Sequence, residues 1–255
     1  MSINVNTVYT TVLSILNKEQ RGYLTPDEFN KIATQVQLEI FEKFFEDYNQ
    51  YIRMPQTDVE FASRMDHIME EFQVFESTGP SITIPAGGAQ TDNVYNQPSD
   101  LHRFGSASWN KGTNSPPIEI LTNKVYNQIK LSDLTQPSDN LPVAKYNKNQ
   151  LTVFPDSTPY ASSDVTFNYI RKPNDVVWGY GVNPTLGNYV WDGTPGFTLT
   201  PVIPSTGSVN FEISGSQQTE VILEILKYSG IIIRDPQIVQ AASQELAQEE
   251  VNSKR

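Results

Sequence analysis

The spacing of apolar residues changes twice along this 255-residue chain, and these changes constrain its fold more than any single motif. Up to about residue 77, apolar side chains recur three or four positions apart, which is typical of helices that bury one face. From Gly79-Pro80 to about residue 215, short alternating or β-branched runs lie between turn residues, which is typical of strands. Helical spacing returns over residues 216–255. The order predicts an α+β protein, in which N- and C-terminal helices form a layer with an inserted antiparallel β domain, a small sheet or a sandwich.

Residues 1–77 are predicted to form a helical bundle. Its first helix covers about residues 5–16, and its third about residues 58–73. The second helix should begin at Pro26, where Thr25 can cap it and Glu28 completes a capping box. It should run to about residue 52, and the width of its apolar face indicates that the helix packs against other elements on more than one side. That face is formed by Phe29, Ile32, Ala33, Val36, Ile40, Phe41, Phe44, Phe45, Tyr48 and Tyr51.

Residues 78–215 are predicted to be rich in β-structure. The expected strands are residues 81–84, 102–109, 117–121, 142–147, 150–155, 164–171, 196–200 and 209–213. Residues 147–149 should form the turn of a hairpin, because two strand-like runs meet there across asparagines. A short helix is expected within residues 121–134, and residues 179–196 carry turn residues throughout, which predicts a long loop.

Residues 216–255 are predicted to form two helices that pack on the N-terminal bundle, dock on a partner, or do both. The first should end at Gly230, because glycine commonly terminates helices. The second should begin at Asp235-Pro236, where aspartate can cap the helix and proline can occupy its first position.

The segment "NKEQRGYLTPDEF", residues 17–29, is similar in outline to the calcium loop of an EF-hand. Gly22 and Glu28 match its sixth and twelfth positions. The third and fifth positions hold Glu19, which is too long, and Arg21, whose charge repels a cation. A degenerate loop, in which helix capping replaces the ion, is therefore the favoured interpretation.

No catalytic, cofactor-binding or metal-binding residue is predicted. The chain has no cysteine, which excludes thiol chemistry, and its two histidines, His67 and His102, lie outside any carboxylate cluster. Asp156, Asp164 and Asp175 flank strands without a spacing that predicts a paired-carboxylate site. A sugar-stacking platform is a possible role for the aromatic residues of the predicted long loop, Trp178, Tyr180, Tyr189 and Trp191.

The net charge of −11 argues against tight nucleic-acid binding, because the chain has no basic stripe. Acidic residues exceed basic ones by seven in residues 1–77 and by two in each of the other two segments. Such a surface suits general solubility, and it also suits a wall past which DNA slides. No apolar run reaches the roughly 20 residues of a membrane helix, and the first residues are not typical of a signal peptide.

Five ordered blocks of the sequence resemble a structural protein of tailed bacteriophages, particularly crAss-like and related podovirus-type phages. They are residues 8–51, "QPSDLHRFGSASW" (97–109), "LTVFPDS" (151–157), "VTFNYIRKPNDVVWGY" (165–180) and residues 222–245. The entry from "PSDL" into a strand is similar to the neck adaptors of podoviruses, and the resemblance spans nearly the whole chain.

The resemblance implies a non-enzymatic virion protein, a head-to-tail connector or adaptor of the neck, assembled in the host cytoplasm. Such adaptors form dodecameric rings beneath the portal, extend the DNA channel and dock on the portal through their C-terminal segment. The expected partners are other copies of the chain, the portal protein, further neck or tail proteins, and genomic DNA that passes without specific binding, with no membrane. The alternative from the residues alone is a calcium- or carbohydrate-binding β module with a helical N-terminal domain.

Overall fold

The computed structural model describes residues 2–18, 24–53, 69–79, 93–110, 115–138, 140–147, 149–155, 165–183, 185–194, 202–204, 207–233 and 236–253. The predicted strand at 81–84 lies outside these residues, as do residues 196–200 and most of the predicted third helix. Residues 69–73, the end of that helix, are helical.

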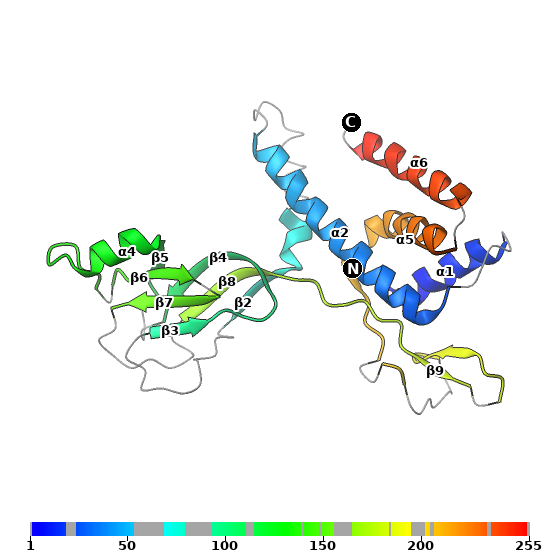
Figure 1. Cartoon of the computed structure of the whole chain (residues 1–255), viewed down its shortest axis with the longest axis horizontal. Coiled ribbons are helices and arrows are strands. Elements are labelled where there is room, and N and C mark those ends of the chain that lie inside the picture. The colour runs from blue at the N-terminus through cyan, green and yellow to red at the C-terminus, as the bar shows by residue number, and fades with distance from the viewer. Residues whose placement is uncertain are drawn as a thin grey trace. The chain divides into compact units, whose positions relative to one another are not determined.

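The chain forms two compact units, and the predicted α+β class is confirmed (Figure 1). A helical unit contains Met1–Glu71 and Pro173–Arg255, and a sheet unit, inserted between them in sequence, contains Phe72–Lys172. The predicted boundaries at residues 78 and 216 differ from this division. The strand at residues 76–79 already pairs within the sheet unit, whereas residues 173–215 belong to the helical unit.

Among the described residues, long helices from the two ends of the chain build the helical unit. They are α1 (Val5–Lys18), α2 (Pro26–Arg53), α5 (Gln218–Ile233) and α6 (Pro236–Ser253), with a 3₁₀ turn, η1 (Gly215–Gln217), before α5. Helix α5 contacts each of the other three helices, as the predicted helical layer requires. The core residues Val12, Phe29, Phe41 and Ile225 are buried. Strand β1 (Ser2–Ile3) pairs antiparallel with β11 (Phe211–Ser214), which joins the first residues to the segment before α5.

Helix α5 continues past Gly230, so the predicted end at this glycine is wrong. Gly230 lies where α5 meets α6, and a Cβ atom there would be only 3.0 Å from Val239 Cγ2. Close packing of the two helices, rather than termination of the first, explains the glycine.

A polar stripe on α2, formed by Asn30, Thr34 and Gln37, holds the backbone of residues 174–178. Asn30 and Thr34 each donate to and accept from main-chain groups of this segment, over 2.7–3.3 Å. Gln37 donates to a carbonyl of the same segment over 2.7 Å and accepts from the Glu212 N–H over 2.8 Å. Every second residue of an extended chain lies roughly 6 Å from the one before, which is close to the rise of one helical turn. Side chains one turn apart on α2 can therefore bond to alternate residues of the extended segment.

The predicted loop at residues 179–196 contains a hairpin, so that prediction is wrong in part. Strand β9 (Tyr180–Val182) pairs antiparallel with β10 (Tyr189–Trp191). Gly187, at a φ of 69°, donates from its N–H to the Asn183 carbonyl and closes the turn. The high density of turn residues concealed two three-residue strands.

The sheet unit is a seven-stranded sheet in the order β2-β8-β4-β5-β6-β7-β3. The strands are β2 (Glu76–Gly79), β3 (Asn93–Asn96), β4 (Leu101–Trp109), β5 (Pro117–Leu121), β6 (Val143–Asn147), β7 (Gln150–Phe154) and β8 (Val165–Arg171). The predicted hairpin is confirmed as β6–β7, with Asn149 at a φ of 64° in its turn. Trp109, Leu151, Phe167 and other buried side chains form the core.

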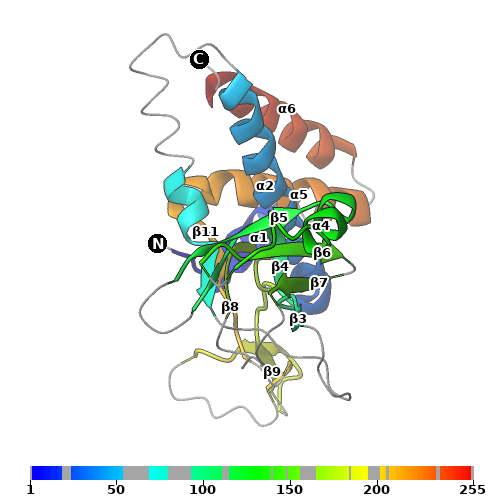
Figure 2. The same ribbon diagram turned by 90° about the vertical axis from the view of Figure 1, so that its left-hand side faces the viewer.

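The sheet is mixed rather than purely antiparallel, because β5 and β6 run parallel. The connection between them carries the predicted short helix, α4 (Asn123–Lys130), which acts as the crossover that parallel strands require. Helix α4 lies against β6 (Figure 2). Its Tyr126 is buried in a small cluster with Val143 and Phe154. This small second core is the reason why the helix remains docked.

Because the sheet unit is continuous in sequence and has its own core, residues 72–172 are expected to fold when expressed alone. We expect dispersed amide NMR signals and one cooperative urea transition. Phe167→Ala should lower the free energy of unfolding of the fragment by about 3–5 kcal/mol, since the ring is fully buried. A fragment with random-coil amide shifts would contradict its independence.

Candidate functional site

The corner before α2 shows the predicted capping box. The Thr25 N–H and hydroxyl both donate to Glu28 Oε2, over 3.0 and 2.6 Å, and the Glu28 N–H donates to Thr25 Oγ1 over 3.4 Å. These hydrogen bonds from Thr25 hold the pKa of Glu28 below its ordinary value of 4.5. The carboxylate that a calcium loop would turn toward the ion is therefore used to start the helix. Glu19 and Arg21 lie outside the described residues.

Removal of this cap should produce two measurable effects. Thr25→Ala is expected to lower the free energy of unfolding by about 1 kcal/mol at neutral pH, because the first turn of α2 loses its reciprocal bonds. In Glu28→Gln, the free energy of unfolding should decrease less than in the wild type as the pH is lowered. A depressed carboxyl pKa contributes stability that is present above the unfolded pKa and is lost as pH falls through the folded pKa, below about 4.5. Urea unfolding across this pH range measures both effects.

Glu46→Gln is a control on the same helix, because Glu46 is exposed and lies in the second half of α2, away from the capping box. Equal acid sensitivity in the wild type and Glu28→Gln would contradict the role of Glu28. The same variant tests the calcium alternative by titration calorimetry. Calcium heat that is lost in Glu28→Gln would mean that the corner binds the ion.

Three of the four aromatic residues proposed as a sugar platform, Trp178, Tyr180 and Tyr189, form a row that starts inside the helical unit. Trp178 is buried, with its ring centroid 4.4 Å from Tyr9 and 5.9 Å from Tyr180, and its Nε1 donates to Asn6 Oδ1 over 3.0 Å. Tyr189 packs edge-on against Tyr180, with centroids 5.1 Å apart. The buried Trp178 anchors the hairpin, and only the outer members of the row reach the surface.

A carboxylate clamp fixes the end of the same hairpin. Both oxygens of Asp192 accept hydrogen bonds from Ser208, one from its N–H over 2.6 Å and one from its hydroxyl over 2.5 Å. Ser208 Oγ in turn accepts from Trp191 Nε1 and from the Gly179 N–H. A Cβ atom at Gly179 would lie 2.5 Å from Asp192 Oδ2, so this close approach requires glycine. The hairpin is thus held at its base by a row of rings and by this clamp.

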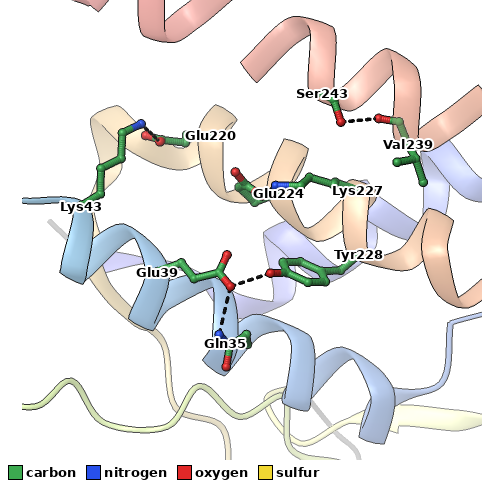
Figure 3. Close-up of polar contacts among 9 residues, drawn as sticks. All are labelled: Gln35, Glu39, Lys43, Glu220, Glu224, Lys227, Tyr228, Val239 and Ser243. Carbon is green, nitrogen blue, oxygen red and sulfur yellow. Dashed lines mark hydrogen bonds and ion pairs between the residues drawn. The ribbon is translucent and has the colours of Figure 1, made fainter. Parts of the chain in front are cut away.

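A polar groove of about 310 Å³ lies among α2, α5 and α6 (Figure 3). Lys43 pairs with Glu220 over 2.7 Å, and the Tyr228 hydroxyl donates to Glu39 over 2.5 Å. This hydrogen bond to a carboxylate raises the pKa of Tyr228 to about 12, so the hydroxyl stays protonated at neutral pH. The Lys43–Glu220 ion pair and the Tyr228–Glu39 hydrogen bond both join α5 to α2, so they stabilise the packing of these two helices. The groove is lined by Glu39, Ile40, Lys43, Glu220, Glu224, Lys227, Ser243, Leu246 and Ala247.

Exposed leucines gather in the segment between α4 and β6 of the sheet unit. Leu131, Leu134 and Leu141 are exposed, and Leu134 keeps 94% of its surface accessible. The sequence interpretation overlooked these residues, although three leucines in an eleven-residue polar segment are a visible signal. Several exposed apolar side chains within one short segment are typical of surfaces that contact another protein.

Over the residues that the structure describes, no group of three or more His, Cys, Asp or Glu side chains could hold a metal ion. Within the same ranges, no helix has the length and apolar character needed to cross a bilayer. Asp175 is exposed, whereas His67, Asp156 and Asp164 lie outside the described residues.

No protein-family model matches the chain, and no curated protein matches it.

Proposed function

We propose that this chain is a non-enzymatic structural subunit of the neck of a tailed bacteriophage, a connector that joins portal to tail as a ring. The observation that carries the proposal is the resemblance of five ordered blocks, spread from residue 8 to residue 245, to proteins of this class. We take twelve copies as the stoichiometry, because the adaptors that the chain resembles form twelve-fold rings.

Exposed apolar side chains on both units support a role in assembly. Leu134 in the sheet unit and Leu186 in the helical unit keep 94% and 76% of their surfaces accessible, and each has other exposed apolar residues within four positions in the sequence. Subunit contacts bury surfaces of this kind, whereas a solitary exposed leucine has no such meaning. A ring subunit needs two different contact surfaces, one for each neighbour.

The charge of the chain suits a channel through which DNA passes. A ring of subunits that each carry a net charge of −11 presents a strongly negative surface to the phosphate backbone. Repulsion from such a wall would prevent the DNA from adhering during packaging and ejection. This argument supports passage of DNA without sequence-specific binding.

Cryo-electron microscopy of the phage particle that contains this chain tests the proposal. The expected result is density for this chain in a ring at the portal–tail junction, with twelve-fold symmetry. A map in which that junction is built entirely from other chains would overturn it. Mass photometry of the purified chain mixed with portal rings of the same phage is a second test, in which up to twelve copies should add to each portal.

A further inference from the structure

The helical unit is assembled from two pieces of the chain that lie far apart in sequence. Helices α1 and α2 belong to the N-terminal piece, residues 1–71, and both pack against α5, which belongs to the C-terminal piece, residues 173–255. Strand β1 pairs with β11 across the same gap. A 14-residue helix such as α1 is marginal by itself in water, because helix nucleation is unfavourable. The N-terminal piece therefore depends on the C-terminal piece for its packing.

Polar contacts join the same two pieces. The Val5 N–H donates to Asn210 Oδ1 over 3.0 Å, and Lys43 pairs with Glu220 over 2.7 Å. The polar stripe of α2 bonds to residues 174–178. The residues joined in this way are 137 to 205 positions apart in sequence. Each of these contacts encloses the entire sheet unit, so the chain must close a loop around that unit before the contact forms.

The sheet unit has no such requirement, because all of its strands come from one continuous part of the chain. The β6–β7 hairpin lies inside the connection from β4 to β8, and this connection lies inside the one from β2 to β8. Local hairpins form faster than distant pairings, and each pairing shortens the loop that the next one has to close. The nested pairings therefore allow the sheet unit to fold before the helical unit.

The folded sheet unit brings its own two ends together. The Arg171 N–H donates to the Phe75 carbonyl over 2.9 Å, and the Arg171 guanidinium donates to the Val74 carbonyl over 3.2 Å. The N-terminal piece ends at Glu71 and the C-terminal piece begins at Pro173, close in sequence to these bonded residues. The chance that two ends meet falls with the 3/2 power of loop length, so shortening the loop from about 100 residues to about ten raises it about 30-fold.

We propose that the sheet unit acts as a folding clasp. It folds first and holds the ends of the two pieces together, and the helical unit then closes on α5. In this order α1 and α2 become packed only when the C-terminal piece is present, so the surface of the helical unit exists only on a complete chain. The inference does not rest on the proposed neck function, and the folding experiments that test it are independent of that assignment.

Pulsed hydrogen exchange with mass spectrometry, during refolding of the full-length chain from urea, tests the order of the two units. The amides of β4 and β8 should become protected before those of α1, α2 and α5. The three helices should then gain protection in a single phase, because α1 and α2 both pack on α5. Protection of α1 and α2 before the sheet unit, or together with it, would overturn the proposed order.

Phe167→Asp tests the clasp itself. Phe167 is fully buried, so an unpaired carboxylate at this position should prevent the sheet unit from folding. The helical unit should then close about 30-fold more slowly, with its unfolding rate unchanged, since only the loop is longer. Leu151→Asp is added if β4 and β8 remain protected, because Leu151 is buried in the same core.

The matched control is Asn168→Asp, which introduces the same carboxylate at the next position of β8. Asn168 is exposed, so this variant should refold at the wild-type rate in both units. Closure of the helical unit at the wild-type rate while the sheet unit is unfolded would overturn the clasp. A helical unit that no longer closes at all would also overturn it, because a longer loop slows closure without abolishing it.

Discussion

Replacing Gln37 by leucine is expected to lower the free energy of unfolding of the helical unit by about 1–3 kcal/mol. Gln37 is only 1% exposed, and its amide bonds to the Asn174 carbonyl over 2.7 Å and the Glu212 N–H over 2.8 Å. Leucine has a similar volume, so packing changes little, but each of these two backbone groups loses a partner. A typical hydrogen bond contributes about 0.5–1.5 kcal/mol, and these two bonds are only partly buried, so two lost bonds give the expected range. Urea unfolding followed by circular dichroism measures the loss.

Gln35→Leu is the matched control, two residues away on the same helix. Gln35 is exposed, and its amide donates to Glu39 one turn along the same helix, so its replacement should change stability by less than about 0.5 kcal/mol. Hydrogen exchange should show faster exchange at the Glu212 amide in Gln37→Leu and no change in Gln35→Leu. Similar losses in both variants would mean that leucine on α2, rather than the missing bonds, causes the destabilisation.

Local features of the fold were predictable from the sequence because their causes lie within a few residues. The start of α2 follows from Thr25 and Glu28, which make hydrogen bonds within one turn, and from Pro26 at the first helical position. The β6–β7 hairpin follows from two strand-like runs and a short polar turn, and α4 follows from its own spacing of apolar residues. In each case, residues within the element or next to it favour the observed conformation over other local conformations.

Distant features were not predictable, since they depend on which segments meet. The bonds from the polar stripe of α2 to residues 174–178 span more than 130 positions in sequence. Nothing near Asn30 or Thr34 indicates that an extended chain will lie beside them. A polar repeat at residues 30, 34 and 37 beside the apolar face of α2 is the one local hint. The boundary at residue 173 follows from these contacts, so it was misplaced for the same reason.

The exposure of the candidate surface residues was not predictable for the same reason. Trp178, Tyr180, Tyr189 and Trp191 were recognised together, but the sequence could not separate anchors from exposed members. That distinction depends on Tyr9, which lies about 170 positions away in sequence and contacts Trp178.

Replacing Trp178 by alanine is expected to lower the free energy of unfolding by about 3–5 kcal/mol, the largest effect that we expect from one substitution in the helical unit. The indole is 4% exposed, contacts the rings of Tyr9 and Tyr180, and donates to Asn6. Its removal leaves a cavity and separates the hairpin from α1. Urea unfolding gives the total loss, and hydrogen exchange of residues 180–191 shows whether the hairpin opens.

Tyr189→Ala is the control, because it removes a ring of the same row that is exposed. The variant should lose no more than about 1 kcal/mol, and its hairpin amides should stay protected by the Trp178 anchor. If Tyr189→Ala lowered the free energy of unfolding as much as Trp178→Ala, the exposed ring of Tyr189 would itself be needed to stabilise the hairpin. If only Trp178→Ala is costly, stability comes from the buried end. The outer face is then free to change its partner without cost to the fold, as a subunit contact requires.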